Sequence, residues 1–215
     1  MLKMPVLETR RMILRPASPA LADAALEFYR RNAARLREVE PQAPEEFLTL
    51  SFQRRMQRQD RAAARRGEGV RFWMFRKEDP GTAVGCVALN SIVWGAFRSC
   101  FLAYKTDGAL LRQGYGSEAV NAVVDFAFHG LGLHRVEANI MPRNQASLAL
   151  ARTCGFREEG RSPAYLQING VWEEHIHMVK LNEEYGAMGS IAALLRRGGS
   201  PPSRAGRAVK PDRSV

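Results

Sequence analysis

The bend Gly114-Tyr115-Gly116 restricts the fold more than any other part of the sequence, because it joins a predicted strand to a predicted helix. The strand covers residues 100–106. The helix has an apolar face at three- and four-residue spacing, formed by Ala119, Val120, Val123, Val124, Ala127 and Phe128. Glycine has no side chain to keep a ligand from the backbone, and the first amides of a helix attract anions. We therefore predict that the amides of residues 112–117 bind a phosphate group.

The residues around this bend narrow the kinds of phosphate site that are possible. No Gly-Lys-Ser/Thr follows, which excludes a Walker loop, and Asn121 and Ala122 stand where a dinucleotide motif needs a further glycine. Arg112 adds a positive charge, while Ser117 and Glu118 suit the free amides and the positive end of a helix. A tight turn before a buried helix would produce the same pattern without a ligand, so both interpretations remain open.

The remaining elements predict an α/β protein with a mixed sheet. Their order is β-α-α-β-β-β-α-β-α-β-β, without internal repeats. Ser18 and Pro19 predict the start of the first helix, and Asn169-Gly170 predicts the turn of the last hairpin. The predicted strands cover residues 12–15, 71–76, 83–92, 100–106, 134–141 and 171–181, with a first hairpin turn at 78–81; residues 156–160 and 165–169 are predicted to be extended and supply the strand before the last. Two further helices are predicted at residues 45–65 and 144–153.

The last thirty residues differ from the rest of the chain in composition. They contain six Lys or Arg residues and a single Asp, so about half of the net charge of +10 lies in residues 186–215. The Gly, Ser and Pro residues at 198–203 cannot form a packed element. We predict a domain at residues 1–185 and a basic, disordered tail at 186–215. The tail is either a solvated extension or a weak electrostatic contact to RNA or the ribosome surface.

The composition argues against several classes of protein. Charged residues near the start interrupt any secretory segment, and the most apolar window, residues 119–133, is too short to cross a membrane. The three cysteines lie far apart, which favours buried thiols of a cytoplasmic protein over disulfides. His175 and His177 lack neighbouring metal ligands, so no metal site is expected. The prediction is a cytoplasmic protein without a membrane partner.

The order of these motifs resembles the GNAT acetyltransferases. Segment 112–119, RQGYGSEA, is similar to the family's motif A, written Q/R-x-x-G-x-G/A. The segments TRRMILRP at 9–16 and YLQINGVW at 165–172 resemble the RimJ branch, the ribosomal-protein-alanine N-acetyltransferases. The resemblance covers residues 7–182. It implies a GNAT fold with about seven strands and about four helices, and an enzyme that transfers acetyl from acetyl-CoA to an amine.

The resemblance also implies where acetyl-CoA would bind. Its pyrophosphate would lie on the amides of residues 112–117, beside Leu111, where the family has Gln or Arg; Arg112 would substitute for that residue by charge. The pantetheine arm would pair like an extra strand with residues 104–106. Asn144 would help to hold the pantetheine, and Ser147 would hydrogen-bond the departing thiolate. The predicted contacts are Tyr104, Lys105, Thr106, Leu111, Arg112, Gln113, Gly114, Tyr115, Gly116, Ser117, Asn144 and Ser147.

The general base is the main departure from the family. RimJ- and RimL-like chains tend to have a carboxylate just before the tyrosine that matches Tyr165, and this chain has Ala164 there. Glu137 is the first choice for a carboxylate that acts through water, followed by Glu159 and Glu174. The predicted catalytic residues are Glu137, Glu159 and Ser147. Each of them also fits an ordinary structural role, as a polar strand residue or a residue in the first turn of a helix.

A weak base favours one class of acceptor. An α-amine has a pKa of about 7.7–8 and lysine one of about 10.4, so deprotonating lysine costs roughly 3–4 kcal/mol more at neutral pH. The predicted acceptor is therefore the N-terminal α-amine of a protein, such as a ribosomal protein. Two alternatives remain. The acceptor is a small amine (an amino acid, a polyamine or an antibiotic), or the chain is a non-catalytic CoA-binding, RNA-associated module.

Overall fold

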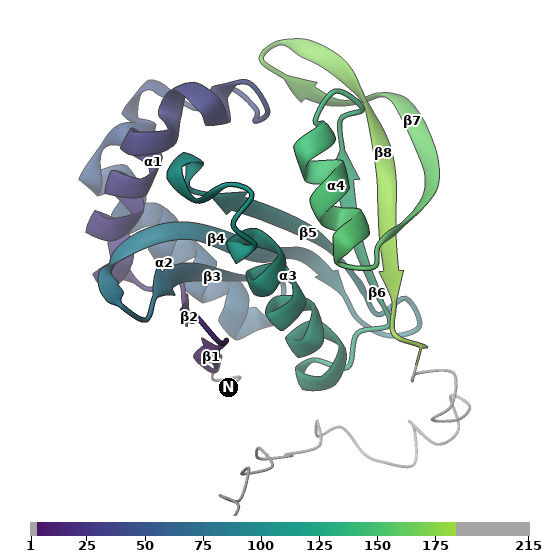
Figure 1. Ribbon diagram of the computed structural model, residues 1–215, viewed down its shortest axis with the longest axis horizontal. Helices are drawn as coiled ribbons and strands as arrows, with labels where there is room; N and C mark the ends of the chain where they lie inside the picture. The colour runs from purple at the N-terminus through teal and green to yellow at the C-terminus, as the bar shows by residue number, and fades with distance from the viewer. Residues whose placement is uncertain (1–3, 184–215) are drawn as a thin grey trace, which may run out of the picture. The chain divides into compact units, whose positions relative to one another are not determined.

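One mixed sheet of eight strands organises the computed structural model, which describes residues 4–183 (Figure 1). All neighbouring strands are antiparallel except β5 and β6, which are parallel. This arrangement confirms the predicted α/β class and mixed sheet. In spatial order the strands are β1 (Leu7–Glu8), β2 (Met12–Pro16), β3 (Val70–Arg76), β4 (Asp79–Val93), β5 (Ser99–Thr106), β6 (Arg135–Ile140), β8 (Val171–Leu181) and β7 (Arg157–Ile168). The predicted domain boundary at residue 185 and the basic segment 186–215 lie outside the described residues.

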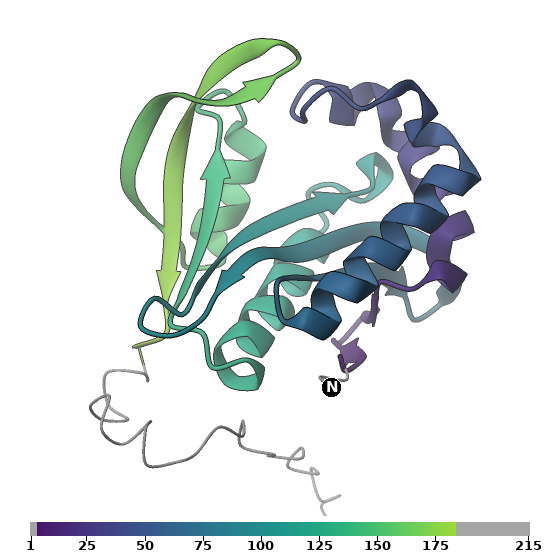
Figure 2. The same ribbon diagram turned by 180° about the vertical axis from the view of Figure 1, so that it is seen from behind.

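Four α-helices cover the two faces of this sheet, as the views from opposite sides show (Figures 1 and 2). The helices are α1 (Ala22–Arg37), α2 (Leu50–Arg66), α3 (Tyr115–Asp125) and α4 (Gln145–Thr153), and a π-helical turn at Phe126–Gly130 extends α3. The predicted second helix is divided, because Glu45–Leu48 forms a 3₁₀ turn and α2 begins only after Thr49. The Thr49 hydroxyl accepts from the Phe52 amide at 3.3 Å and caps the helix.

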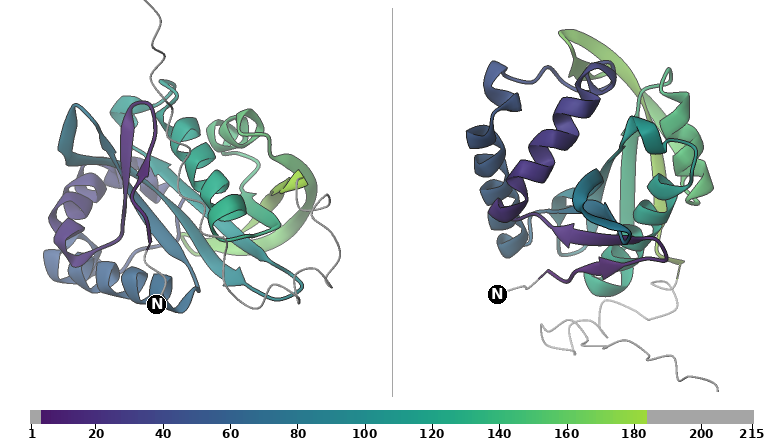
Figure 3. Two further views of the ribbon diagram at one scale, coloured as in Figure 1. Left: turned by 90° about the horizontal axis from the view of Figure 1, so that it is seen from below. Right: turned by 60° about the vertical axis from the view of Figure 1, so that its left-hand side comes forward.

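Side chains that alternate along β3 divide the core between the two faces. Phe72 and Met74 lie in a buried cluster with the apolar residues of α3, among them Val123. Trp73 lies in the second cluster with Phe28 of α1. Because neighbouring strand residues point to opposite faces, one strand anchors helices on both sides. Figure 3 shows α1 and α2 on one side of the sheet and α3 and α4 on the other.

The sheet separates into two arms between β5 and β6. These strands pair over three residues only, from Ser99 with Arg135 to Phe101 with Glu137. Beyond this point β5 still pairs with β4 as far as Thr106, and β6 pairs with β8 as far as Ile140. Each strand is therefore held by its outer neighbour while its inner edge is open.

Three local predictions differ from the structure. Leu7–Glu8 forms an additional short strand, which accounts for eight strands where about seven were expected. The first hairpin turns at residues 77–78 and not at 78–81, because Asp79 already pairs with Arg76. The two extended segments predicted after residue 156 are one strand, β7, with an irregular register between Ser162 and Leu166.

Candidate active site

The open inner edge of β5 presents backbone groups of the predicted pantetheine strand. The Asp107 amide donates to the Val84 carbonyl of β4 at 2.8 Å. Since successive strand residues point their amides and carbonyls to opposite edges, those of Tyr104 and Thr106 face away from β4. At this level no described strand pairs with that edge. An extended ligand could therefore add to β5 as a strand would.

The loop between β5 and α3 supplies a second set of backbone donors. Among residues 4–183, no hydrogen bond satisfies the amides of residues 112–117. Residues 111–114 are exposed, and α3 begins directly behind them at Tyr115. Unpaired amides at a helix N-terminus attract an anion through their partial positive charge. The loop therefore has the unpaired backbone amides that a phosphate site requires.

The two glycines of this loop have different physical roles. Gly114 caps α3 with φ +80°, a left-handed conformation that glycine adopts readily. Gly116 is buried, and a β-carbon there would lie 2.8 Å from Leu150 Cδ1 and 2.9 Å from Thr106 Oγ1. It permits close packing of α3 on α4 and β5, which corrects the expectation that it gives a ligand access to the backbone. Of the side chains predicted beside the pyrophosphate, Leu111 is exposed and Gln113 donates to the Ala109 carbonyl at 2.9 Å.

Arg11, which sequence reasoning missed, fixes this loop from the N-terminal side. Its Nε donates to Glu118 Oε2 at 2.7 Å, and its Nη1 donates to the Gln113 carbonyl at 2.9 Å. The guanidinium also lies 4.1 Å from the centre of the Tyr115 ring. Burial opposes ionisation of Glu118, but hydrogen bonds from Thr9 and Arg11 outweigh it and lower the pKa of this carboxyl. A permanent positive charge thus lies beside the unpaired amides.

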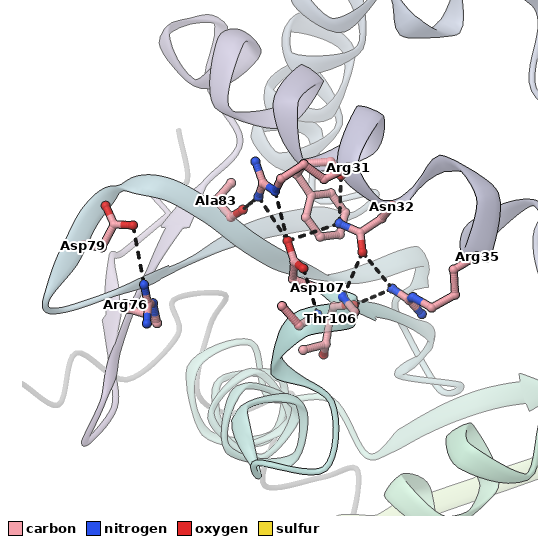
Figure 4. A network of polar contacts seen from close by, with 11 residues as sticks. Arg31, Asn32, Arg35, Arg76, Asp79, Ala83, Thr106 and Asp107 are labelled. Atoms are coloured by element: carbon pink, nitrogen blue, oxygen red, sulfur yellow. Dashed lines mark hydrogen bonds and ion pairs between the residues drawn. The ribbon is translucent and has the colours of Figure 1, made fainter.

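A polar network joins α1 to the point where β5 enters the loop (Figure 4). Asp107 accepts from Arg31 Nη2 at 3.1 Å and from Asn32 Nδ2 at 3.2 Å. Asn32 Oδ1 accepts from the Gly108 amide at 2.8 Å, and Arg35 donates to the Thr106 carbonyl at 2.5 Å. Burial acts to raise the pKa of Asp107, but these donors together with the Ala109 amide lower it. The network fixes the end of β5, and through Arg35 it occupies the Thr106 carbonyl at the end of the inner edge.

Tyr104 and Ser147 meet on the α3 and α4 side of the opening. The Tyr104 hydroxyl lies 2.8 Å from Ser147 Oγ and donates to the Ser147 carbonyl at 3.0 Å. Asn144 caps α4 by accepting from the Ser147 amide at 3.2 Å. Burial raises the pKa of Tyr104 to about 12, against a smaller opposing effect of the hydrogen bond to Ser147. The structure therefore brings three predicted residues together. Two of them, Tyr104 and Ser147, carry hydroxyl groups that can stabilise a thiolate.

Two predicted carboxylates, Glu137 and Glu159, lie on the opposite face of the sheet, and both form ion pairs with Arg135. Arg135 donates to Glu137 Oε2 and contacts Glu159 Oε2, each at 2.7 Å. Glu137 Oε1 also lies 3.2 Å from His177 Nδ1. Glu174 is separate and lies 3.7 Å from Arg161. Glu137 is thus held between a guanidinium and an imidazole, which suits it to orient the imidazole.

A cavity of about 890 Å³ opens beside α1 on this same face. Asn169, in the turn between β7 and β8, reaches its rim and donates to the Arg37 carbonyl at 2.5 Å. Glu40 also lines it and forms an ion pair with Lys105 at 2.5 Å, so the Lys105 side chain points toward α1. The larger apolar side chains of the lining are Tyr29, Leu36, Phe47, Leu48, Phe52 and Met56.

No helix among residues 4–183 has the length and apolar character needed to span a membrane. Within the same range, no group of three or more His, Cys, Asp or Glu side chains is arranged to hold a metal ion.

Comparison with known proteins gives consistent matches. The family described as acetyltransferase (GNAT) domain matches residues 11–157. The probable N-acetyltransferase YjcK of Bacillus subtilis (strain 168) is 32% identical over 179 residues, 83% of this chain and 98% of the relative. The ribosomal protein uS5-alanine N-acetyltransferase of Escherichia coli (strain K12) is 27% identical over 170 residues, 79% and 87% of the two chains. Mycobacterium smegmatis RimJ in complex with CoA-disulfide superimposes with a TM-score of 0.79 at 26% identity, covering 90% of this chain and 95% of that one.

Proposed function

The chain belongs to the GNAT acetyltransferase family, and we propose that it acetylates the α-amine of a protein N-terminus with acetyl-CoA as donor. The observation that carries this proposal is the pair of free backbone surfaces at the start of α3. Six unpaired amides and the open edge of β5 lie in one continuous segment, residues 102–117. They match the two chemically distinct parts of CoA, a pyrophosphate and an amide-containing pantetheine chain.

The residues present fit this donor. The amides of residues 112–117 would hold the pyrophosphate, with Arg11 and Arg112 as nearby positive charges. The backbone of Tyr104 and the amide of Thr106 would pair with the pantetheine amides, while the Thr106 carbonyl already accepts from Arg35. A relative with 26% identity, M. smegmatis RimJ, has been determined with CoA-disulfide, which supports CoA as the ligand. Bound acetyl-CoA supplies a thioester carbonyl that an amine can attack.

The reaction needs a group that accepts the proton of the amine and a group that stabilises the departing thiolate. The two faces of the opening supply one of these each. As nitrogen bonds to the acetyl carbon and the carbon–sulfur bond breaks, the amine loses a proton and sulfur becomes a thiolate. The Ser147 hydroxyl, held by Tyr104, donates a hydrogen bond to that thiolate. On the opposite face, the polar residues near Glu137 take the proton of the amine.

The cavity beside α1 supports a protein N-terminus as the acceptor of the acetyl group. The cavity of about 890 Å³ beside α1 is large for a single small amine and has mainly apolar walls, which suits the first side chains of a peptide. No described carboxylate stands in the β7 segment around Ala164 to deprotonate a lysine. An α-amine, with its lower pKa of about 7.7–8, needs less assistance. The uS5-alanine N-acetyltransferase relative supports a ribosomal protein as acceptor.

Release of free thiol from acetyl-CoA tests the proposal. The purified chain is mixed with acetyl-CoA, a thiol reagent and peptides that begin with alanine or serine and contain one lysine. Release that requires a free α-amine is the expected result. The matched control is the same peptide with a blocked N-terminus, which presents only lysine. Release with spermidine or an amino acid alone would move the acceptor to a small amine, and CoA binding without any release would indicate a non-catalytic module.

A further inference from the structure

Four arginines form a stripe along one side of α2, the helix that lies in front of the sheet in Figure 2. Their spacing of four, three and four residues keeps them on one side of the helix, and all four are exposed. At a rise of about 1.5 Å per residue, the stripe extends over roughly 16 Å. We call it the arginine ridge, and it consists of Arg54, Arg58, Arg61 and Arg65.

The charge of the arginine ridge is almost unneutralised. Arg54 lies 4.0 Å from Asp23, at the limit of an ion pair. In the described part of the chain, the side chains of the other three arginines form no ion pair or hydrogen bond. The single acidic residue of α2, Asp60, pairs instead with Arg71 of β3 at 2.8 Å. The guanidinium groups of the ridge are therefore available to a negatively charged partner.

The helix α2 concentrates positive charge that the rest of the domain lacks. Residues 50–66 contain six arginines and one aspartate, a net charge of +5. The whole chain carries +10, and about half of that lies in residues 186–215. The charges of all other residues therefore cancel almost completely. A positive charge that is gathered on one exposed helix attracts polyanions, of which nucleic acids are the most common.

Two exposed aromatic residues lie in the turn between β4 and β5. Trp94 is 42% exposed and Phe97 is 59% exposed. Trp94 Nε1 donates to the carbonyl of Gly67, the C-cap of α2, at 2.8 Å. Gly67 follows Arg65, the last arginine of the ridge, by two residues. One edge of the indole is thus fixed at the end of α2 while much of the ring remains in solvent, an arrangement on which an unpaired base can stack.

We infer that the arginine ridge and Trp94 bind single-stranded RNA. The guanidinium groups pair with phosphate oxygens along the strand, and one base stacks on the indole of Trp94. A duplex would satisfy the arginines, but its bases are already stacked on one another. An acidic protein segment would also satisfy the arginines, but it has no base to place on an exposed indole. The ridge and Trp94 together therefore favour a single strand.

The choice of RNA over DNA rests on the proposed function. The proposed acceptor is the N-terminus of a protein such as a ribosomal protein, and ribosomal proteins are bound to RNA. The geometry of α2 fits such an acceptor, because Phe52 and Met56 of the same helix line the cavity beside α1.

The cavity and the ridge lie on opposite sides of α2. Phe52 and Met56 each precede a buried glutamine of the helix by one residue, whereas Arg54 and Arg58 each follow one. Because each residue turns the helix by about 100°, these two pairs lie on either side of the buried stripe. One rigid helix can therefore hold RNA on one side and the first residues of an RNA-bound acceptor on the other.

The salt dependence of RNA binding tests the ridge. A labelled, short single-stranded RNA is titrated with the full chain, without acetyl-CoA or peptide, at several salt concentrations. Arg58→Gln/Arg61→Gln should weaken binding and reduce the slope of log K against log salt by about 1.4, since each phosphate contact contributes about 0.7. The segment 186–215 is present in every variant, so its contribution cancels in the comparison.

A matched double variant controls for the loss of charge alone. Arg152→Gln/Arg157→Gln removes two exposed arginines, one from α4 and one from β7. It should keep the affinity and the salt slope of the wild type. An equal fall in the two double variants would overturn the ridge as a binding surface, because any two positive charges would then serve.

Substitution of Trp94 tests the stacking of a base. Trp94→Leu should weaken binding of the single strand by about 5- to 150-fold and leave the salt slope unchanged. Trp172→Leu is the matched control, since this indole is 61% exposed on β8 and should not affect binding.

Fluorescence gives a second measurement that does not depend on the folding of Trp94→Leu. In Trp172→Phe the remaining indoles are Trp94 and the buried Trp73. RNA should quench the emission of Trp94 in this variant, and emission that RNA left unchanged would overturn the stacking.

Two competitors and one cell experiment decide between the classes of partner. A polyglutamate peptide should compete poorly with the RNA; equal competition, with no effect of Trp94→Leu, would indicate an acidic protein and overturn the inference. Ultraviolet crosslinks of the wild type in cells should be removed by RNase, and crosslinks removed only by DNase would overturn RNA as the ligand. Duplex RNA that bound more tightly than the single strand would overturn it as well.

The failures of the two proposals are distinguishable. Loss of all RNA binding with intact release of thiol from acetyl-CoA would overturn the RNA surface and leave the proposed function standing. Intact RNA binding without thiol release from any amine would overturn the proposed function and leave the RNA surface standing.

Discussion

Phe101 and Glu137 are the last residues at which β5 and β6 pair, and the sheet opens immediately beyond them. β5 continues for five residues to Thr106; no described strand pairs with its inner edge there, and Arg35 occupies the Thr106 carbonyl. The unpaired amides of residues 112–117 come next along the chain, in the loop that leads from β5 to α3. Backbone groups, rather than side chains, therefore make up most of the proposed acetyl-CoA site, and the side chains expected to matter are those that hold this backbone in place.

Removing the Ser147 hydroxyl should affect the chemical step more than binding. If this hydroxyl stabilises the departing thiolate, Ser147→Ala should lower kcat by roughly 10²-fold, as the loss of one transition-state donor does. The KM for acetyl-CoA should change little. Burial raises the pKa of Tyr104 to about 12, so its hydroxyl remains protonated and Tyr104→Phe should lower kcat without changing the pH profile between 6 and about 9. Thr153→Ala, which removes another hydroxyl from α4, is the matched control, and an equal loss there would contradict the role of Ser147.

Gly114 should contribute to CoA affinity through its backbone conformation. Gly114→Ala places a β-carbon on a residue with φ +80°, which costs about 1 kcal/mol and turns the neighbouring amides. We expect about a tenfold loss of CoA affinity by calorimetry. Gly170→Ala is a close control, since Gly170 has φ +83° and no atom near its missing β-carbon. It should lose similar stability and no CoA affinity, and equal affinity losses in both variants would contradict the prediction.

The sequence was most informative where structure depends on neighbouring residues. Alternating apolar positions predicted the main strands, and Asn144 was correctly expected at a helix start, whereas α3 begins at Tyr115, inside the predicted glycine turn. The fold class and the position of the amide loop follow from these local patterns. Leu7–Glu8 was missed because a two-residue strand has no recognisable period.

Contacts between distant residues could not be predicted in this way. Arg11 and Glu118 are separated by 107 residues, and nothing in either local sequence indicates the partner. His177 was noted only as a strand residue, because its contacts come from two other strands, β6 and β7. For Ala164 the sequence showed the loss of a carboxylate, but not that the backbone there is left-handed.

Arg11 should raise CoA affinity by its charge and by holding the loop. Arg11→Ala removes the contacts to Glu118, the Gln113 carbonyl and the Tyr115 ring. We expect a loss of CoA affinity of about tenfold, or about 1.4 kcal/mol, which becomes smaller at high salt. Arg15→Ala is the matched control.

Arg15 makes the same kinds of contact away from the loop. It donates to the Pro80 carbonyl at 2.9 Å and lies 4.4 Å from the centre of the Phe75 ring. Loss of this residue should therefore cost comparable stability but leave CoA binding intact. If the two variants weakened CoA binding equally, the effect of Arg11 would be one of general stability and not of the site.

Asp107 should stabilise the fold in a pH-dependent way. Its donors lower the pKa of the carboxyl below that of the unfolded chain, so the stabilisation is present above about pH 3.9 and is lost as the pH falls through the lowered value. At pH 7, Asp107→Asn should reduce the free energy of unfolding by on the order of 1–3 kcal/mol, because Arg31 and Asn32 lose a charged acceptor. Urea unfolding from pH 7 to 2.5 should show wild type and variant converging at the acidic end. A difference that stays constant over this range would mean that the contribution comes from shape and not from the charge of Asp107.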